Sequence, residues 1–254
     1  MGFMDLAIQT YWETHIHDQE IARYPVGSAE FFRELEDYRF EKLSYLPKAV
    51  DFSGHGGKKL LEIGCGVGID LVRFARGGAL ATGIDLARTA IELARRNFAL
   101  NGLNADLFLM NGEALEFEEA SFDVVYAHGV LQYTTNANKM ISEINRVLRP
   151  GGEAILMVYN RYSWLNLLAW LTKVDLEHQD APVLKKFSIG EFKRLLEPFS
   201  DFRILPERFP VKTRLHHGLK AVLYNEVFVR SFNLIPKIVT RPFGWHLMAF
   251  AQKM

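Results

Sequence analysis

Residues 60–68 read LLEIGCGVG, an apolar run that contains one acidic residue and leads into glycines at every second position. The run is typical of a buried strand, and the next residues, 69–76, have the apolar spacing of a helix. Glycines between a strand and a helix let the backbone turn sharply and lie against a ligand, close to the free amide groups of the helix. The stretch therefore predicts a strand, a ligand-binding loop and a helix.

The same alternation extends outward from this stretch. As far as residue 160, short apolar runs alternate with amphipathic stretches, which is the pattern of helices that connect the strands of a parallel sheet. We expect Gly77 and Gly78 to end the first helix, and Thr89 and Glu92 have the spacing of a capping box for the second. The first fifty residues are expected to be helical. The expected strands are residues 59–63, 80–84, 107–110, 122–127, 153–159, 202–205 and 245–251, and the expected helices are residues 69–76, 88–100, 137–148 and 189–196.

Composition favours a single soluble domain. The chain has 254 residues, 49% of them hydrophobic, and its 30 basic side chains balance 30 acidic ones, so no global charge attracts nucleic acid or an anionic membrane. Cys65 is the only cysteine, which excludes an intrachain disulfide and a cysteine-rich metal site and fits a reducing cytoplasm. With neither a signal peptide nor an apolar run of about 18 residues, we expect a cytoplasmic protein that is soluble or at most peripheral to a membrane.

Two inserts interrupt the second half of the chain. The first, residues 160–187, holds Trp164 and Trp170, and the second, at about residues 207–244, has seven basic side chains against two acidic ones. We interpret the basic insert as a solvated helical cap, a pocket for an anionic acceptor, or a surface for a membrane or RNA, and the sequence leaves these three readings open. Its apolar residues at helical spacing are Leu215, Leu219, Val222 and Leu223.

Asp85 stands seventeen residues beyond Gly68, at the expected end of the second strand. A carboxylate there can accept both hydroxyl protons of a ribose, which indicates a nucleoside-bearing cofactor. A nicotinamide dinucleotide fingerprint would have GxGxxG with no need for an acid before the loop, whereas here Glu62 precedes the loop and the third glycine comes early. This difference favours S-adenosylmethionine, whose charged amino-acid end must be held without a pyrophosphate.

Four stretches of the chain resemble motifs of the class I S-adenosylmethionine-dependent methyltransferases, in the methyltransferase 11 or ubiquinone/menaquinone-biosynthesis branch. They are LLEIGCGVG (60–68), GIDLA (83–87), NGEALEFEEASFDVVYAHGVLQY (111–133) and EINRVLRPGG (143–152), so the resemblance covers about residues 58–160. It implies an α/β Rossmann-like fold with a seven-stranded sheet of order 3-2-1-4-5-7-6 and strand 7 antiparallel. We expect one domain with an N-terminal helical lid (1–57), a cofactor-binding core (58–160) and a substrate-side half (161–254) that includes the inserted cap (about 207–244).

The resemblance gives the 60–68 stretch and Asp85 roles in holding the cofactor. Glu62 and the loop glycines would shape the pocket for the methionine end, and Asp85 would hold the ribose. Simpler roles stay open: Glu62 would cap buried backbone, or Asp85 would be the N-cap of the following helix. Cys65 is interpreted as a small loop residue rather than a nucleophile, because no base is evident beside it.

Residues 86 and 111–113 would surround the adenine. Leu86 would lie beside the ring, and Gly112 and Glu113 would offer backbone groups to its edge. Asn111 departs from the family, which usually has Asp here, but its side-chain oxygen can still accept a proton from the adenine amino group. The cofactor-binding residues implied are Glu62, Gly64, Cys65, Gly66, Gly68, Asp85, Leu86, Asn111, Gly112, Glu113, Ala127 and His128.

Ala127 and His128 come at the end of the fourth expected strand and are implied to face the methyl group and the acceptor. The following loop opens at the carboxyl ends of the strands, where ligands bind in such folds, so His128 and Tyr133 are the candidate catalytic residues. Whether they remove a proton or only position the acceptor stays open, because displacement at a sulfonium can be accelerated by alignment alone.

An aromatic and polar set near the N-terminus is expected to fold over the cofactor as a lid or substrate wall. His15, His17 and Asp18 do not define a coordination sphere, because two alternate histidines point in different directions, so no metal is expected. The expected lid residues are Tyr11, Trp12, His15, Tyr24, Tyr38 and Arg39.

The sequence thus predicts methyl transfer from S-adenosylmethionine to a small-molecule acceptor, with S-adenosylhomocysteine as the product, by a monomer or homodimer. The acceptor class follows from an aromatic-rich cover built from both ends of the chain and from the neutral net charge. One alternative is RNA (tRNA) methylation, which needs a continuous basic face. The other is a protein that binds the cofactor without transferring its methyl group.

Overall fold

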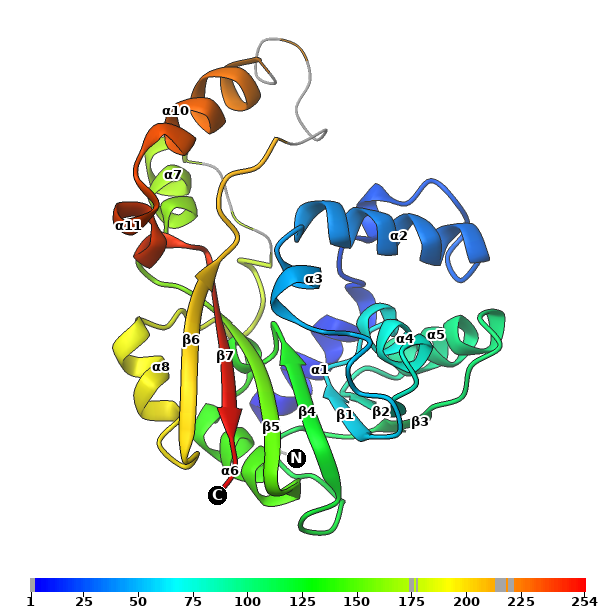
Figure 1. Cartoon of the computed structure of the whole chain (residues 1–254). Helices are drawn as coiled ribbons and strands as arrows, with labels where there is room; N and C mark the ends of the chain where they lie inside the picture. Colours follow the sequence, from blue (N-terminus) through cyan, green and yellow to red (C-terminus); the bar gives the residue numbers. More distant parts are fainter. Residues whose placement is uncertain (1–2, 174–175, 177, 213–217, 219–221) are drawn as a thin grey trace.

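The computed structural model describes residues 3–173, 176, 178–212, 218 and 222–254 of the chain. A seven-stranded sheet has the order β3-β2-β1-β4-β5-β7-β6, which confirms the expected order (Figure 1). Strand β7 runs antiparallel to β5 and β6, whereas the pairs among β1 to β5 are parallel. The strands are β1 (Lys59–Ile63), β2 (Leu80–Asp85), β3 (Asp106–Leu109), β4 (Phe122–His128), β5 (Leu148–Tyr159), β6 (Asp201–Glu207) and β7 (His246–Gln252).

Helices cover both faces of the sheet, as a parallel sheet requires. Successive side chains of β1 point to opposite faces, so Leu60 packs with the apolar side chains of α4 and α5, and Leu61 with those of α6 and α8. Strand β5 begins earlier than expected because Leu148 pairs with Phe122 ahead of a register shift in β4. The four helices confirm the expected ones to within one residue and are α4 (Ile69–Arg76), α5 (Arg88–Leu100), α6 (Ala137–Val147) and α8 (Ile189–Leu195).

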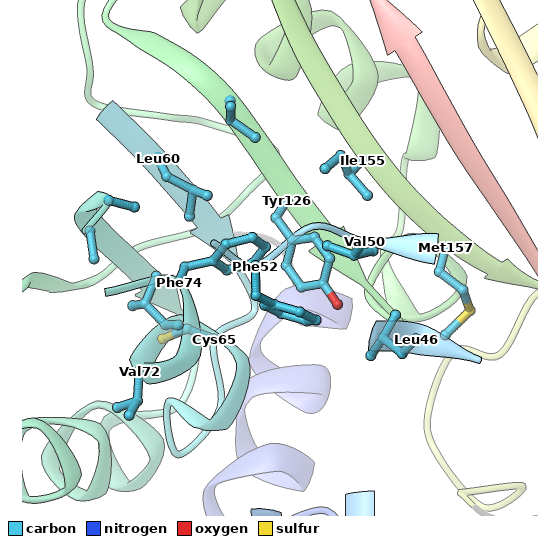
Figure 2. Close-up of a cluster of buried hydrophobic side chains, with 14 of the residues drawn as sticks. Leu46, Val50, Phe52, Leu60, Cys65, Val72, Phe74, Tyr126, Ile155 and Met157 are labelled. Atoms are coloured by element: carbon cyan, nitrogen blue, oxygen red, sulfur yellow. The ribbon is translucent and has the colours of Figure 1, made fainter. Parts of the chain in front are cut away.

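The N-terminal segment is helical, as expected, and contributes to the core of the sheet. It comprises α1 (Phe3–Thr14), the short 3-10 helix η1 (Gln19–Ile21), α2 (Ala29–Lys42) and α3 (Leu46–Ala49). Figure 2 shows Phe52, just after α3, beside Phe74 of α4 and Tyr126 of β4. The ring centroids of Phe52 and Phe74 are 4.5 Å apart, and those of Phe74 and Tyr126 are 5.1 Å apart. Burying each ring contributes about 1.5–3 kcal/mol, so this segment is bound firmly to the core.

The start of α5 differs from the expectation of a capping box. Ala87 is its N-cap residue and makes no side-chain cap, so the interpretation of Thr89 and Glu92 was wrong. Instead the carboxylate of Glu13 in α1 accepts from the backbone N–H of Arg88 at 2.8 Å and of Thr89 at 3.0 Å. A carboxylate at a helix N-terminus satisfies free amide groups and interacts favourably with the helix dipole, so this contact joins α1 to the cofactor-binding half.

The two inserts pack against each other. Figure 1 shows α7, α10 and α11 gathered at one end of the molecule, beyond the tip of β6. The ring of Trp164 lies 6.0 Å from that of Phe228 and 6.2 Å from that of Phe232. Val222 and Leu223 are 52% and 54% exposed, whereas Leu215 and Leu219 lie outside the described residues. We call this group the cap; it therefore includes α7 of the first insert as well as the helices of the expected cap at about 207–244. It consists of α7 (Trp164–Thr172), the π-helix η3 (Leu223–Phe228), α10 (Val229–Leu234), α11 (Lys237–Thr240) and the 3-10 helix η4 (Arg241–Phe243).

Candidate active site

A cavity lies at the carboxyl ends of the parallel strands. Its wall includes the loop after β1, Asp85 at the end of β2, residues 110–113 after β3, His128 at the end of β4 and Tyr159 at the end of β5. Side chains of α1 and α2 complete the wall, and in Figure 1 the arrow of β4 points toward α3. This is the edge where ligands bind in open α/β sheets.

The three glycines of the loop have left-handed backbone conformations, with φ of 68° at Gly64, 52° at Gly66 and 79° at Gly68. A Cβ on Gly64 would lie 2.4 Å from a methyl carbon of Val130, so this glycine is required by close packing. A Cβ on Gly66 would meet no protein atom within 4 Å, and Gly66 lines the cavity. Gly68 is the N-cap of α4 and is not part of the cavity wall. The space beside Gly66 is therefore left for a ligand.

Asp85 holds this loop through its carboxylate. Oδ2 accepts from the backbone N–H of Gly66 and Oδ1 accepts from that of Ala87, both at 2.9 Å. Burial raises the pKa of Asp85, and these backbone donors act in the opposite direction. Because a carboxylate has about four acceptor sites, acceptor capacity remains for hydroxyl groups in the cavity.

Glu62 brings a second carboxylate to the cavity wall. The residue is 5% exposed, and its Oε2 atom has no hydrogen-bond partner among the described residues. Burial raises the pKa of Glu62 well above its usual value, the charge of Asp70 adds to this, and the charge of Arg39 opposes it. A buried carboxylate oxygen without a donor needs one, and the ammonium group of a methionine moiety would supply it.

Residues 86 and 111–113 line the cavity next to Asp85. The side-chain oxygen of Asn111 accepts from the backbone N–H of Glu113 at 2.8 Å, so this oxygen already has a donor within the protein. The Glu113 carboxylate accepts from Thr135 Oγ1 at 2.8 Å and from the backbone N–H of Asn136 at 3.0 Å. These bonds fix the segment after the short 3-10 helix η2 (Leu131–Tyr133) against the wall.

His128 is one member of a chain of hydrogen bonds that crosses the cavity. Arg39 of α2 donates through Nε to Asp70 Oδ1 at 2.6 Å, and Tyr126 donates to the other oxygen of Asp70 at 2.7 Å. A second guanidinium nitrogen of Arg39 lies 3.3 Å from His128 Nδ1. Because an arginine can only donate, Nδ1 of His128 is the acceptor in this contact.

The chain of hydrogen bonds continues from His128 toward the β6 edge of the sheet. The hydroxyl of Tyr45 lies 3.2 Å from His128 Nε2 and 2.6 Å from His246 Nδ1. Arg208, which directly follows β6, donates through Nη1 to His246 Nε2 at 3.0 Å. Tyr45, His246 and Arg208 were not predicted from the sequence; Arg208 and His246 line the cavity together with His128.

Burial and the positive charge of Arg39 lower the pKa of His128 to about 3. Burial and the charge of Arg208 lower the pKa of His246 well below its usual value. Both imidazoles are therefore neutral near pH 7. The one lone pair of neutral His128, on Nδ1, already accepts from Arg39, and its protonated form is unfavourable, so it is a weak proton acceptor.

The low pKa of His128 predicts a loss of stability in acid. An unfolded histidine binds a proton below about pH 6.5, whereas folded His128 stays neutral down to about pH 3. The contribution of His128 to the free energy of unfolding is therefore highest above about pH 6.5 and decreases as the pH falls below that value. Between pH 7 and pH 5 we expect His128 alone to lower the free energy of unfolding by about 2 kcal/mol. In urea titrations, the free energy of unfolding of His128→Asn should differ between pH 7 and pH 5 by about 2 kcal/mol less than that of the wild type. The same pH dependence in both proteins would contradict the assignment.

Aromatic side chains from both halves of the chain line the cavity near His128. Trp12 meets Tyr133 edge to face with ring centroids 5.1 Å apart, and the Tyr133 hydroxyl lies 3.4 Å from that of Tyr159. Tyr159 stacks on Trp245 at 4.5 Å. Tyr133 is 7% exposed, so this candidate catalytic residue forms part of a packed aromatic wall. Ala127, the other expected neighbour of the methyl group, is fully buried and does not line the cavity.

Half of the expected lid residues reach the cavity. Of the others, Tyr24 is 51% exposed, Tyr38 lies beneath the ammonium group of Lys42, and Tyr11 donates to Asp180 Oδ1 at 2.9 Å. The lid residues on the wall are Trp12, His15 and Arg39.

The side chains of the 15–18 segment have separate partners. His15 stacks on Tyr11 at 3.9 Å, and His17 Nδ1 lies 2.8 Å from His178 Nε2. Asp18 Oδ1 accepts from Lys42 Nζ at 2.6 Å. The segment therefore closes over the cavity through contacts with α2 and with the first insert.

Comparison with known proteins agrees with this geometry. Residues 61–156 match the model of a family described as a methyltransferase domain. A ubiquinone biosynthesis O-methyltransferase of Idiomarina loihiensis is 28% identical over 66% of this chain and 74% of its own length. A protein of the same name from Pseudomonas entomophila is 30% identical over 66% of this chain and 69% of its own length.

Solved structures show the same fold over the whole chain. A geranyl diphosphate C-methyltransferase from Streptomyces coelicolor has a TM-score of 0.62 at 16% identity and covers 100% of this chain and 99% of its own. The sheet order, the glycine loop with Glu62 and Asp85, and the sequence relatives together lead to one assignment. The chain belongs to the class I S-adenosylmethionine-dependent methyltransferases.

Proposed function

We propose that this enzyme transfers the methyl group of S-adenosylmethionine to a small-molecule acceptor held in the cavity beside His128. One observation carries this proposal. The same cavity has two carboxylates near the glycine loop and an aromatic wall around the end of β4. The relatives named as O-methyltransferases of ubiquinone biosynthesis support a small organic acceptor rather than RNA. The single cysteine, Cys65, is free and buried, and it supports the cytoplasm as the location.

Residues of β1 and β2 would hold the cofactor. The unpartnered oxygen of Glu62 is suited to the ammonium group, and the remaining acceptor sites of Asp85 are suited to the ribose hydroxyls. The open space beside Gly66 admits the ligand close to the backbone, and Leu86 and Gly112 line the part of the wall assigned to the adenine. When bound, S-adenosylmethionine supplies a methyl group on a positively charged sulfur.

Residues of β4 and the lid would prepare the acceptor. Neutral His128 is held from both sides by Arg39 and Tyr45, so its ring is a fixed part of the wall against which the acceptor is positioned. Trp12 and Tyr133 exclude water from this part of the cavity. Alignment and exclusion of water supply much of the acceleration in a direct displacement, so we assign His128 a positioning role.

The test is incubation of the purified protein with methyl-labelled S-adenosylmethionine and fractionated bacterial extract. We expect the label in a nuclease-resistant small-molecule or lipid fraction. Label only in nuclease-sensitive material would replace this proposal by RNA methylation. Binding of the cofactor without label in any fraction would favour a protein that binds without transfer.

We further propose that the whole chain acts as one domain, with the lid, core and substrate-side half at the boundaries given above. Phe52 from the lid is buried against the sheet, and Glu13 caps α5. Strands β6 and β7 complete the same sheet from the C-terminal half. A single cooperative unfolding transition is the expected result, and separate transitions of two parts would contradict it.

We also propose that the cap rests on the surface of an anionic membrane. Among the described residues no helix is both long and apolar enough to cross a bilayer. The cap nevertheless exposes large apolar side chains, with Trp170 at 75% and both Leu234 and Ile238 at 84%. Exposed apolar groups together with basic ones suit the boundary of an anionic bilayer. The exposed basic residues in and next to the cap are Lys173, Arg230, Lys237 and Arg241, of which Arg230 forms an ion pair with Glu226.

Sedimentation with vesicles tests the membrane proposal. We expect the protein to sediment with phosphatidylcholine vesicles that contain phosphatidylglycerol, and less with phosphatidylcholine alone. The double variant Leu234→Ser and Ile238→Ser should lose this binding, while Leu100→Ser, exposed at the end of α5, should keep it. If the double variant instead converts a dimer to a monomer in light scattering and the wild type ignores vesicles, the cap is an interface between two copies.

A further inference from the structure

The charges that line the cavity are not all balanced. Lys42 pairs with Asp18 at 2.6 Å, and Arg39 pairs with Asp70. Arg208 also lines the cavity, but no carboxylate in the part of the chain described by the structure forms an ion pair with it. With both histidines neutral, the end of the cavity near β6 and β7 therefore has one unbalanced positive charge.

Carboxylates and this cation lie toward opposite edges of the sheet. Glu62 is in β1 and Asp85 ends β2, whereas Arg208 follows β6 at the other edge. Glu62 is suited to the ammonium group of the cofactor, and Asp85 to its ribose hydroxyls. The unbalanced guanidinium is left to complement the acceptor.

Arg208 is held in an unusual backbone conformation. Its φ is 59°, in the left-handed region that residues with a Cβ seldom adopt. Its carbonyl accepts from the indole N–H of Trp164 at 2.8 Å and from the backbone N–H of Trp245 at 3.4 Å. Strained residues persist where the surroundings enforce them, often at ligand sites. The cap and the start of β7 thus fix the point from which the side chain extends.

His246 orients the guanidinium. It is 1% exposed, accepts from Arg208 at 3.0 Å and is held on its other nitrogen by Tyr45 at 2.6 Å. Arginine carries five donor N–H groups, so the bond to His246 leaves others for a ligand. His246 is therefore a positioning residue for Arg208.

We propose that Arg208 binds a carboxylate of the acceptor, so that the substrates are monoanionic carboxylic acids with an apolar body. This inference rests on the proposed function. A planar guanidinium matches a carboxylate in a two-point hydrogen bond, and one unbalanced charge suits a monoanion better than a phosphate dianion. Between this anchor and the cofactor the wall is apolar and aromatic, with Trp12, Met157 and Tyr159.

The spacing allows one small molecule to reach both residues. The ring centroids of His128 and His246 are 5.5 Å apart, and Arg208 Nη1 lies 3.0 Å from His246 Nε2. A compact acid can therefore place its carboxylate at Arg208 and its reacting atom beside His128.

Calorimetry with two matched probes tests the anchor. trans-Cinnamate and trans-cinnamamide have the same shape but differ in charge, and each is titrated into protein saturated with S-adenosylhomocysteine. We expect cinnamate to bind at least about tenfold tighter. Arg208→Gln should abolish the difference while S-adenosylhomocysteine binds as before, and Arg241→Gln, at an exposed position of η4, should preserve it.

The outcomes separate this inference from the proposed function. If wild-type protein does not bind S-adenosylhomocysteine, the proposed function fails. If it binds S-adenosylhomocysteine but shows equal affinity for the two probes, or binds neither, only the carboxylate anchor is overturned. Tighter binding of phenyl phosphate than of cinnamate would overturn the choice of a carboxylate. The comparison of probes uses wild-type protein and so does not depend on the folding of any variant.

Discussion

Replacing Asp85 by alanine is expected to weaken the binding of S-adenosylmethionine by at least about 2 kcal/mol, or roughly 30-fold. The carboxylate has two functions that alanine cannot supply. It accepts from the backbone N–H of Gly66 and of Ala87, which fixes the glycine loop. Its remaining acceptor sites face the cavity, where the ribose hydroxyls would donate.

Calorimetry with wild-type protein, Asp85→Ala and Asp106→Ala measures this effect. Asp106 is exposed at the start of β3, the opposite end of the sheet from the cavity, so its variant should bind as wild type does. Asp85→Asn keeps one acceptor oxygen and should fall between the two extremes. Unchanged affinity in Asp85→Ala would reject the role of this carboxylate, and melting curves of the same samples exclude unfolding as the cause.

The sheet could be predicted because its signals are local. The alternation along residues 59–160 predicted β1, α4 and α5 with the bounds that the structure shows. The spacing of apolar residues and the glycines that end the helices involve only neighbouring residues, so they can be recognised without knowledge of the fold. The strand order came from the family resemblance instead, because pairing between distant strands leaves no local signal.

The contact at the start of α5 was mispredicted because contacts between distant segments leave no local signal in the sequence. Thr89 and Glu92 have capping-box spacing, yet the donor groups of α5 are satisfied by Glu13, about 75 residues earlier in the chain. A local pattern states which partners are available within a turn. It contains no information about a carboxylate that the tertiary structure brings to the same amides.

Some residues of the site could be predicted from the sequence and others could not. Residues at the ends of strands were predicted because the motif fixes their place relative to the sheet, as with Asp85 and His128. The chain through Tyr45, His246 and Arg208 is assembled from three distant segments, and none of the three stands in a recognisable motif. Composition also predicted an aromatic lid without identifying which of its residues reach the cavity, because the period of a helix places neighbours about 100° apart.

Gly66→Val is expected to weaken cofactor binding by at least about 100-fold, or roughly 2.7 kcal/mol. Its Cβ would meet no protein atom within 4 Å, so the branched side chain would project into the cavity and occupy volume that the ligand needs. The left-handed φ of 52° adds a cost of about 1–2 kcal/mol to folding, as it would for any residue with a Cβ.

Gly102→Val separates strain from obstruction. Gly102 follows α5, with a φ of 64° and no protein atom within 4 Å of an added Cβ, but it does not line the cavity. Both variants should therefore lose similar stability in urea titrations, while only Gly66→Val loses the cofactor. Wild-type affinity in both variants would mean that the ligand does not approach the loop. If both lost binding equally, strain transmitted through the fold would be the cause, because only one of the two valines stands where the cofactor has to lie.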